Sequence, residues 1–194
     1  RALGRLAPEQ LRQNLETLVN GEMKAAEFVF YQMHSVGALH LSSSEQSLLE
    51  ETLSSSFHVI LDYIFQILGA AGVLPNCEIL FHCLRSKSPR VKSQVVETLE
   101  KTVPMPIFAR IQPLIDSLPL DEKLIRCEEL GICAASVEEI LLYFAQSPIL
   151  SNHIASAVLM QRLQMPGWRE ELRRQMLSKE ELFHRFAYEL LEQQ

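Results

Sequence analysis

The feature that most constrains the fold is the spacing of apolar residues, which recur every three or four positions along almost the whole chain. This is the period of an α-helix, whereas a half-buried strand would alternate every second residue. The sequence contains only seven glycines, so tight hairpin turns have little to start from. The pattern therefore predicts an all-α protein.

Helix boundaries follow from the breaks in this period. A first helix enters near Pro8 and is expected to stop at Asn20-Gly21, because glycine is favoured just past a helix end. Pro104 and Pro106 should break the chain again, since each lacks a backbone donor, and Pro113 is unfavourable inside a helix. The further helices are expected over 22–39, 45–71, 76–84, 89–99, 107–118, 121–131, 136–146, 151–163, 166–177 and 178–192.

Two of these starts have the spacing of a capping box, Ser136 with Glu139 and Ser178 with Glu181. The most apolar stretch is 57–74, which approaches the length of a membrane span. It carries polar residues every four positions, at His58, Asp62 and Gln66, and this stripe favours a core helix with a wet edge.

Composition limits the class of protein. Hydrophobic residues make up 47% and charged residues 22%, the balance of a globular chain. The net charge of −6 disfavours a general nucleic-acid binder, which would carry a basic face. The first residue is Arg1 and no signal region follows, so we expect a piece of a longer protein. We predict a cytoplasmic location.

The four cysteines give no metal or redox motif. The spacings Cys77-x5-Cys83 and Cys127-x5-Cys133 match none of the common zinc or dithiol patterns. His82 is adjacent to Cys83, so the two side chains point to different helix faces. We expect reduced, buried thiols in a reducing compartment, and no metal.

Two stretches of the chain resemble each other when their Ser-Pro turns are aligned, 78–99 and 138–158. Each consists of a short helix, a turn and a second helix, which is the unit of a helical repeat. We expect Val95, Leu99 and Ile154 of the second helices to be buried.

The segment 84–99, LRSKSPRVKSQVVETL, resembles the second half of a HEAT repeat, which opens with a polar-Pro turn followed by Val-Arg. Val91-Lys92 stands at the Val-Arg place, and Val95 stands where alanine is usual. The resemblance implies a short α-solenoid of antiparallel helix pairs. Two departures are that these units are shorter than the roughly 40-residue HEAT norm and that residues 1–74 fit the repeat poorly.

On this basis we expect residues 1–74 to form an N-terminal helical cap or a diverged repeat. Residues 75–194 would form HEAT-like pairs with C-terminal capping helices, within one continuous domain. The segments 112–118 and 121–124 are also similar to HEAT-type segments beside bacterial membrane transporters of the nucleotide-exchange class. That similarity implies a neighbouring membrane domain.

The strongest local charge feature is the cationic turn, defined as Arg85, Lys87, Arg90 and Lys92. It could bind a phosphate, an anionic lipid headgroup or an acidic peptide, helped by the start of the next helix. The alternative is an ordinary solvated turn in which the stem of Lys92 packs between repeats.

The C-terminal segment 168–192 is amphipathic and carries both charge signs. It could dock a partner, but a terminal cap with a polar outer face is the more usual role of such a segment in helical arrays. We predict no catalytic residue and no cofactor, because nucleophile-elbow, phosphate-loop and zincin motifs are absent from the sequence.

The sequence therefore predicts a non-catalytic helical-repeat module that binds a protein or peptide and no nucleic acid. One alternative is a cytosolic regulatory domain of a membrane transporter that binds an anionic ligand and is tethered through regions outside this chain. A third is an all-helical enzyme with an unrecognised site.

Overall fold

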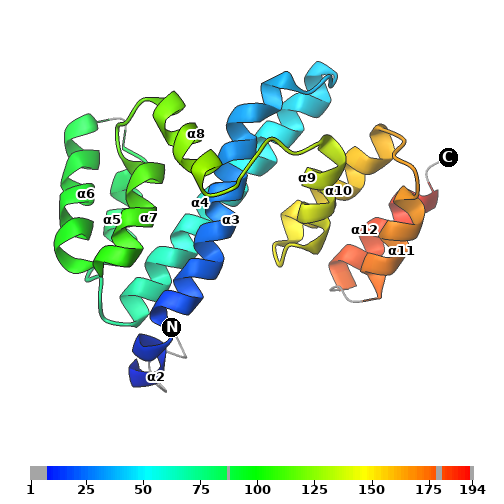
Figure 1. Cartoon of the computed structure of the whole chain (residues 1–194). Helices are drawn as coiled ribbons and strands as arrows, with labels where there is room; N and C mark the ends of the chain where they lie inside the picture. Colours follow the sequence, from blue (N-terminus) through cyan, green and yellow to red (C-terminus); the bar gives the residue numbers. More distant parts are fainter. Residues whose placement is uncertain (1–7, 87, 178–180, 193–194) are drawn as a thin grey trace. The chain divides into compact units, whose positions relative to one another are not determined.

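The protein is all-helical, as the apolar period predicts. The computed structural model describes residues 8–86, 88–177 and 181–192. These residues form 11 α-helices, α2 to α12, with one short 3-10 helix and no strand (Figure 1).

The chain begins with α2 (Pro8–Gln13) and α3 (Leu15–Ser35), and α3 corrects one sequence prediction. The helix expected to stop at Asn20-Gly21 continues through both residues. Glycine inside a helix costs about 1 kcal/mol relative to alanine. Val19, Met23 and Ala26 on the same helix are fully buried, and burying each large apolar side chain contributes about 1.5–3 kcal/mol. The packing of this face outweighs the local preference of glycine.

A 3-10 turn (Val36–Ala38) leads to α4 (Ser43–Ala70), the longest helix described, which confirms the predicted segment 45–71. The Ser42 hydroxyl donates to the Glu45 carboxylate over 2.6 Å, and this bond stabilises the start of the helix. Among the described residues, α4 alone is long and apolar enough to cross a membrane, a test that core helices of soluble proteins also pass. Leu53, Ile64 and Phe65 of this helix are buried within the protein.

The chain divides into two compact units, and both α3 and α4 contribute to each of them. Unit 1 comprises residues 1–31 and 57–133, and unit 2 comprises residues 32–56 and 134–194. The domain boundary expected between residues 74 and 75 stays a prediction.

Unit 1 adds four helices to its parts of α3 and α4. They are α5 (Cys77–Leu84), α6 (Pro89–Thr102), α7 (Met105–Ile115) and α8 (Leu120–Glu129). Helices adjacent in the chain pack on one another, α5 on α6, α6 on α7 and α7 on α8 (Figure 1). The predicted break at Pro104 separates α6 from α7, whereas Pro113 lies inside α7. Ile111, Leu114 and Ile115 around Pro113 are buried and hold this helix in place.

Ionic and other polar groups link the later helices of unit 1 to α3. Arg110 of α7 donates to both oxygens of Glu27, over 3.0 and 2.6 Å, and to the Asn20 amide oxygen over 2.8 Å. The Tyr31 hydroxyl donates to Glu128 of α8 over 2.8 Å. These partners lie 83 to 97 residues apart in the chain, so the links are tertiary contacts.

Unit 2 contains α9 (Val137–Gln146), α10 (Leu150–Arg162), α11 (Trp168–Met176) and α12 (Glu181–Glu192). The capping box predicted at Ser136 and Glu139 is confirmed with both of its bonds, whereas Ser178 of the other predicted box lies outside the described residues. The helices α10, α11 and α12 contact one another around a buried apolar cluster. Its members are Ala157, Leu172, Phe183, Ala187 and Leu190.

Uncharged polar bonds connect the N-terminal elements of unit 2 to α10 and to the segment before α9. The Ser56 hydroxyl donates to the Asn152 amide oxygen over 2.8 Å, and the Ala135 backbone amide donates to the Gln32 side chain over 2.9 Å. Ser56, Asn152 and Gln32 are all buried, so each bond replaces water that was lost on folding.

Two of the three residues predicted for the core are buried. Val95 and Leu99 are buried as expected, and Ile154 is half-buried against the apolar cluster of unit 2. The thiols are all free: Cys127 is buried, but Cys133 is exposed, so the expected burial was wrong there. Cys133 lies two residues beyond Gly131, in the irregular segment that follows α8, and its side chain is exposed.

Candidate functional site

The cationic turn lies in unit 1, between α5 and α6. Arg85 follows the last residue of α5, and its guanidinium group lies over the Phe81 ring at 5.2 Å from the ring centre. Lys87 lies outside the described residues. The Ser88 amide donates to the Ser86 hydroxyl over 3.2 Å, which closes the turn within itself.

The two cations on α6 face different surroundings. Arg90 is exposed, whereas Lys92, two positions later on the helix, is half-buried. Burial lowers the pKa of Lys123 on α8, the nearby Asp116 opposes this, and the charge of Lys92 lowers that pKa further. Lys92 therefore lies near another cation, on the side of α6 toward α8. The role of the cationic turn in binding an anion stays a prediction.

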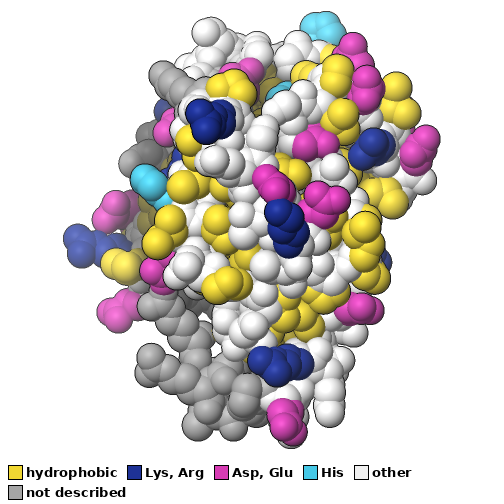
Figure 2. Space-filling view, turned by 90° about the vertical axis from the view of Figure 1, so that its left-hand side faces the viewer, with side chains coloured by type: hydrophobic (Ala, Val, Ile, Leu, Met, Phe, Trp, Pro, Cys, Tyr) yellow, Lys and Arg dark blue, Asp and Glu magenta, His cyan; other side chains and the backbone are white. Residues whose placement is uncertain are grey.

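The surface on this side of the molecule carries charges of both signs. Figure 2 faces the side of Figure 1 on which α6 lies, and shows Lys and Arg side chains spread out and mixed with acidic and apolar ones. A mixed surface of this kind gives a weak local field for an anion.

The described residues contain no group of three or more His, Cys, Asp and Glu side chains that could hold a metal ion. Cys77 and Cys83 are half-buried, while His82 between them in the sequence is exposed.

One pocket in unit 1 surrounds the Arg110–Glu27 ion pair. Its walls come from α3, α7 and α8 and include Pro113, Cys127 and Leu130. Burial, together with the smaller effects of the charges of Glu27 and Glu128, raises the pKa of the Cys127 thiol to about 11. A thiol of this kind stays protonated and is a poor nucleophile. The charges in the pocket already neutralise each other, so it has the character of a packing defect beside a structural ion pair.

A groove in unit 2, which we call the α4–α10 groove, lies between the first half of α4 and α10. It has a volume of about 380 Å³. Among its lining residues, Thr52, Asn152 and Ala155 are buried, the apolar Leu48, Ile154 and Val158 are half-buried, and Glu51, Ser55 and Ser151 are exposed. The lining residues are Leu48, Glu51, Thr52, Ser55, Ser151, Asn152, Ile154, Ala155 and Val158.

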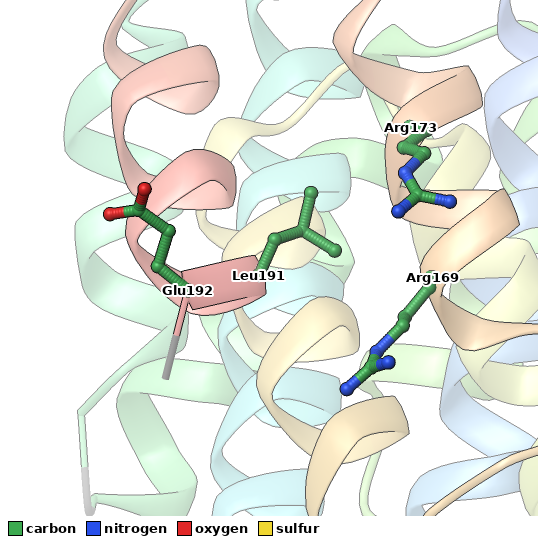
Figure 3. Close-up of a pocket in the computed structure, with 4 residues that line it drawn as sticks. All are labelled: Arg169, Arg173, Leu191 and Glu192. Atoms are coloured by element: carbon green, nitrogen blue, oxygen red, sulfur yellow. The ribbon is translucent and has the colours of Figure 1, made fainter. Parts of the chain in front are cut away.

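A second pocket in unit 2, which we call the arginine pocket, lies between α11 and α12. It is open to solvent, has a volume of about 500 Å³, and is lined by Arg169, Arg173, Leu191 and Glu192. Figure 3 shows Leu191 pointing from α12 toward α11 and the Arg169 side chain extending from α11 toward it, while the Arg173 guanidinium lies beside α11.

Sequence reasoning placed Arg169 and Arg173 in the C-terminal amphipathic segment without recognising them as a pair. Their i, i+4 spacing was the available signal, because side chains four apart share one helix face. The facing wall from α12 carries no such signal, since it depends on how two helices pack. The α4–α10 groove brings together residues about a hundred positions apart and had no signal in the sequence.

Comparisons with known proteins do not identify a function for the chain. No protein-family model, curated protein sequence or solved structure matches the chain.

Proposed function

We propose that the chain is a non-catalytic interaction module that binds a helical segment of a protein partner in the α4–α10 groove. The observation that carries this proposal is the lining of the groove. Leu48, Ile154 and Val158 are only half-buried, so apolar surface remains open to water between two helices. Covering such surface contributes about 25 cal/mol per Å².

The shape and the edge of the groove favour an amphipathic helix as the occupant. A helix that lies between two others presents residues at i, i+3, i+4 and i+7 to an apolar floor. Small residues of the groove, Ala155 and Ser55 among them, leave room for the large apolar anchors of such a helix. Exposed Glu51 at the edge favours a basic residue on the flank of the partner.

The proposal extends to the architecture. We propose that α5 with α6, and α9 with α10, are two HEAT-like antiparallel pairs of a short α-solenoid in the cytoplasm. Each pair packs together and follows one of the two similar stretches of sequence. In such arrays the second helix of each pair lines the binding surface, and α10, which lines the groove, is a second helix.

The test places a photo-crosslinking amino acid at Glu51, on the edge of the groove, and at Tyr63, which is exposed on α4 in unit 1. The partner crosslinked from Glu51 and not from Tyr63 is identified by mass spectrometry, and its helical segment is made as a peptide. We expect this peptide to bind the purified chain.

Two matched substitutions then locate the binding. Val158→Lys puts a charge in the groove and should weaken peptide binding at least tenfold, while Val59→Lys, at a position 45% exposed outside the groove, should leave it unchanged. Equal effects of the two variants, or equal crosslinking from both positions, would show that the groove is not the binding site.

A further inference from the structure

We propose that Ser88 is a phosphorylation site, at which a proline-directed protein kinase transfers a phosphoryl group from ATP. The site lies in unit 1, directly before α6, and the proposal does not depend on the α4–α10 groove. It rests on a contrast between two Ser-Pro turns, Ser88-Pro89 and Ser147-Pro148, which occupy equivalent places in the two similar stretches of the chain.

The hydroxyl group of Ser88 is accessible and is not used by the fold. The Ser88 side chain is exposed, its backbone is extended at φ −80° and ψ 116°, and Pro89 after it is exposed as well. Within the described part of the chain, the Ser88 hydroxyl makes no capping hydrogen bond to α6. A kinase needs a serine hydroxyl that can reach its catalytic aspartate, and the turn before α6 offers one.

Ser147 is followed by the same residue, but its hydroxyl group is already bound. The side chain is half-buried, and its oxygen accepts hydrogen bonds from the Ile149 backbone amide and the Asn152 side-chain amide, both over 3.1 Å. A phosphate on this oxygen would break both bonds and bring charge into the turn between α9 and α10. The two turns therefore share a dipeptide and differ in whether the hydroxyl is available.

Positive charge surrounds Ser88 and is absent from the sequence around Ser147. Arg85 lies three positions before Ser88 and Arg90 two positions after it, and both are exposed, while the first turn of α6 carries no acidic residue. The stretch 140–161 around Ser147 contains no Lys, Arg, Asp or Glu. Kinases select their substrates by charge pattern, and cations beside the serine complement an acidic substrate groove.

The reaction moves the γ-phosphoryl group of ATP to the Ser88 side-chain oxygen. The bond from the γ-phosphorus to the ADP oxygen breaks, the new O–P bond forms, and the hydroxyl proton passes to the catalytic aspartate of the kinase. The phosphate carries a charge of about −1.5 to −2 at pH 7, which offsets about half of the four positive charges of the cationic turn. Because it is attached covalently, it needs no long-range field to meet Arg85 and Arg90, whose guanidinium groups can donate charge-assisted hydrogen bonds to it.

The first test treats the purified chain with ATP and a cyclin-dependent kinase, which requires proline after the target serine. Mass spectrometry follows phosphate incorporation at each serine over time. We expect Ser88 to be modified at least tenfold faster than Ser147. Ser88→Ala should remove this incorporation, and Ser147→Ala should leave it unchanged. Equal rates at the two serines, or no incorporation at Ser88, would overturn the proposal.

A second test asks whether the cations hold the phosphate, and it does not depend on the kinase. Phosphoserine is incorporated at position 88 during synthesis, and the second pKa of its phosphate is measured by phosphorus NMR. Nearby guanidinium groups favour the dianion, so this pKa should be about 0.5 lower than in the same protein carrying Arg85→Gln and Arg90→Gln.

The matched control for charge is Lys101→Gln. This variant removes one positive charge at the other end of α6, where exposed Lys101 pairs with Glu97, and it should leave the phosphate pKa unchanged. Equal pKa values with and without the two arginines would overturn the proposal that the cationic turn holds the phosphate on Ser88.

Discussion

Unit 1 and unit 2 are both helical, yet different forces connect their helices. In unit 1 the contacts from α3 to later helices include the Arg110–Glu27 ion pair and the Tyr31–Glu128 hydrogen bond. In unit 2 the corresponding long-range bonds, such as Ser56 to Asn152, are uncharged, and α10, α11 and α12 share an apolar cluster. We infer that charge specifies which helices meet in unit 1, whereas apolar packing contributes more of the stability of unit 2.

The units also carry different natural reporters. All four cysteines lie in unit 1, and the single tryptophan lies in unit 2. Thiol labelling of buried Cys127 therefore follows the opening of unit 1, and the fluorescence of Trp168 follows unit 2. The first two predictions below use these reporters.

The largest expected effect comes from the apolar cluster of unit 2. Phe183 is fully buried, so Phe183→Ala should lower the free energy of unfolding by about 3–5 kcal/mol. Urea unfolding followed by Trp168 fluorescence checks this. The matched truncation in unit 1 is Leu99→Ala, with an expected cost of about 2–5 kcal/mol that should appear in the labelling of Cys127. A loss below 1 kcal/mol for Phe183→Ala would show that the cluster is not what stabilises unit 2.

The ion pair of unit 1 should give the next largest effect. Glu27→Ala leaves Arg110 without its partner carboxylate, and we expect a loss of about 2–3 kcal/mol because Glu27 is buried while Arg110 is partly hydrated. Faster labelling of Cys127 is the measurement. Replacing both residues, Glu27→Leu with Arg110→Met, should recover at least half of the loss, since an apolar pair avoids the unpaired charge. Failure of the double variant to recover stability would mean that the pair contributes through packing alone.

The buried Cys127 thiol of unit 1 predicts a pH dependence of stability. The pKa of Cys127 is raised to about 11 in the folded protein, above its ordinary value of 9.0. The folded state then holds a proton that the unfolded state releases, so this contribution to stability is complete below about pH 9 and is lost as the pH rises toward 11.

The check is urea unfolding at pH 8 and pH 10.5, compared with Cys127→Ala. The wild-type protein should lose more stability between these pH values than the variant does, as measured by circular dichroism, because the variant lacks the Cys127 thiol. In the native state at pH 8, exposed Cys133 should react with a thiol reagent before Cys127. Equal rates for the two thiols would contradict the burial of Cys127.

The smallest expected effect concerns Arg90 in the cationic turn. Arg90 is exposed, so Arg90→Glu should change the free energy of unfolding by less than about 0.5 kcal/mol. Lys92→Glu should cost more, because Lys92 is half-buried. If Arg90→Glu nevertheless weakens binding of vesicles that contain anionic lipid, the predicted anion-binding role of this turn gains support. Salt should then weaken the binding of the wild-type chain as well.

The sequence alone determined the helical content and most helix positions. The three-to-four spacing of apolar residues is a local property, and so are the starts at Pro89 and Ser136, because proline and capping side chains act within one helical turn. The all-α class, the break at Pro104 and the capping box at Ser136 could all be predicted for this reason.

Only the tertiary structure decided where a local preference would be overruled and which helix faces would meet. Gly21 stays inside α3 because Met23 and Ala26 beside it are buried by other helices. Arg110 is an ordinary polar residue in the sequence until folding brings Glu27 to it from 83 positions away. The arginine pocket likewise needs α12 opposite the Arg169 face. Spacing along a helix fixes which residues share a face, but the partner of that face is set by packing between segments that are distant in sequence.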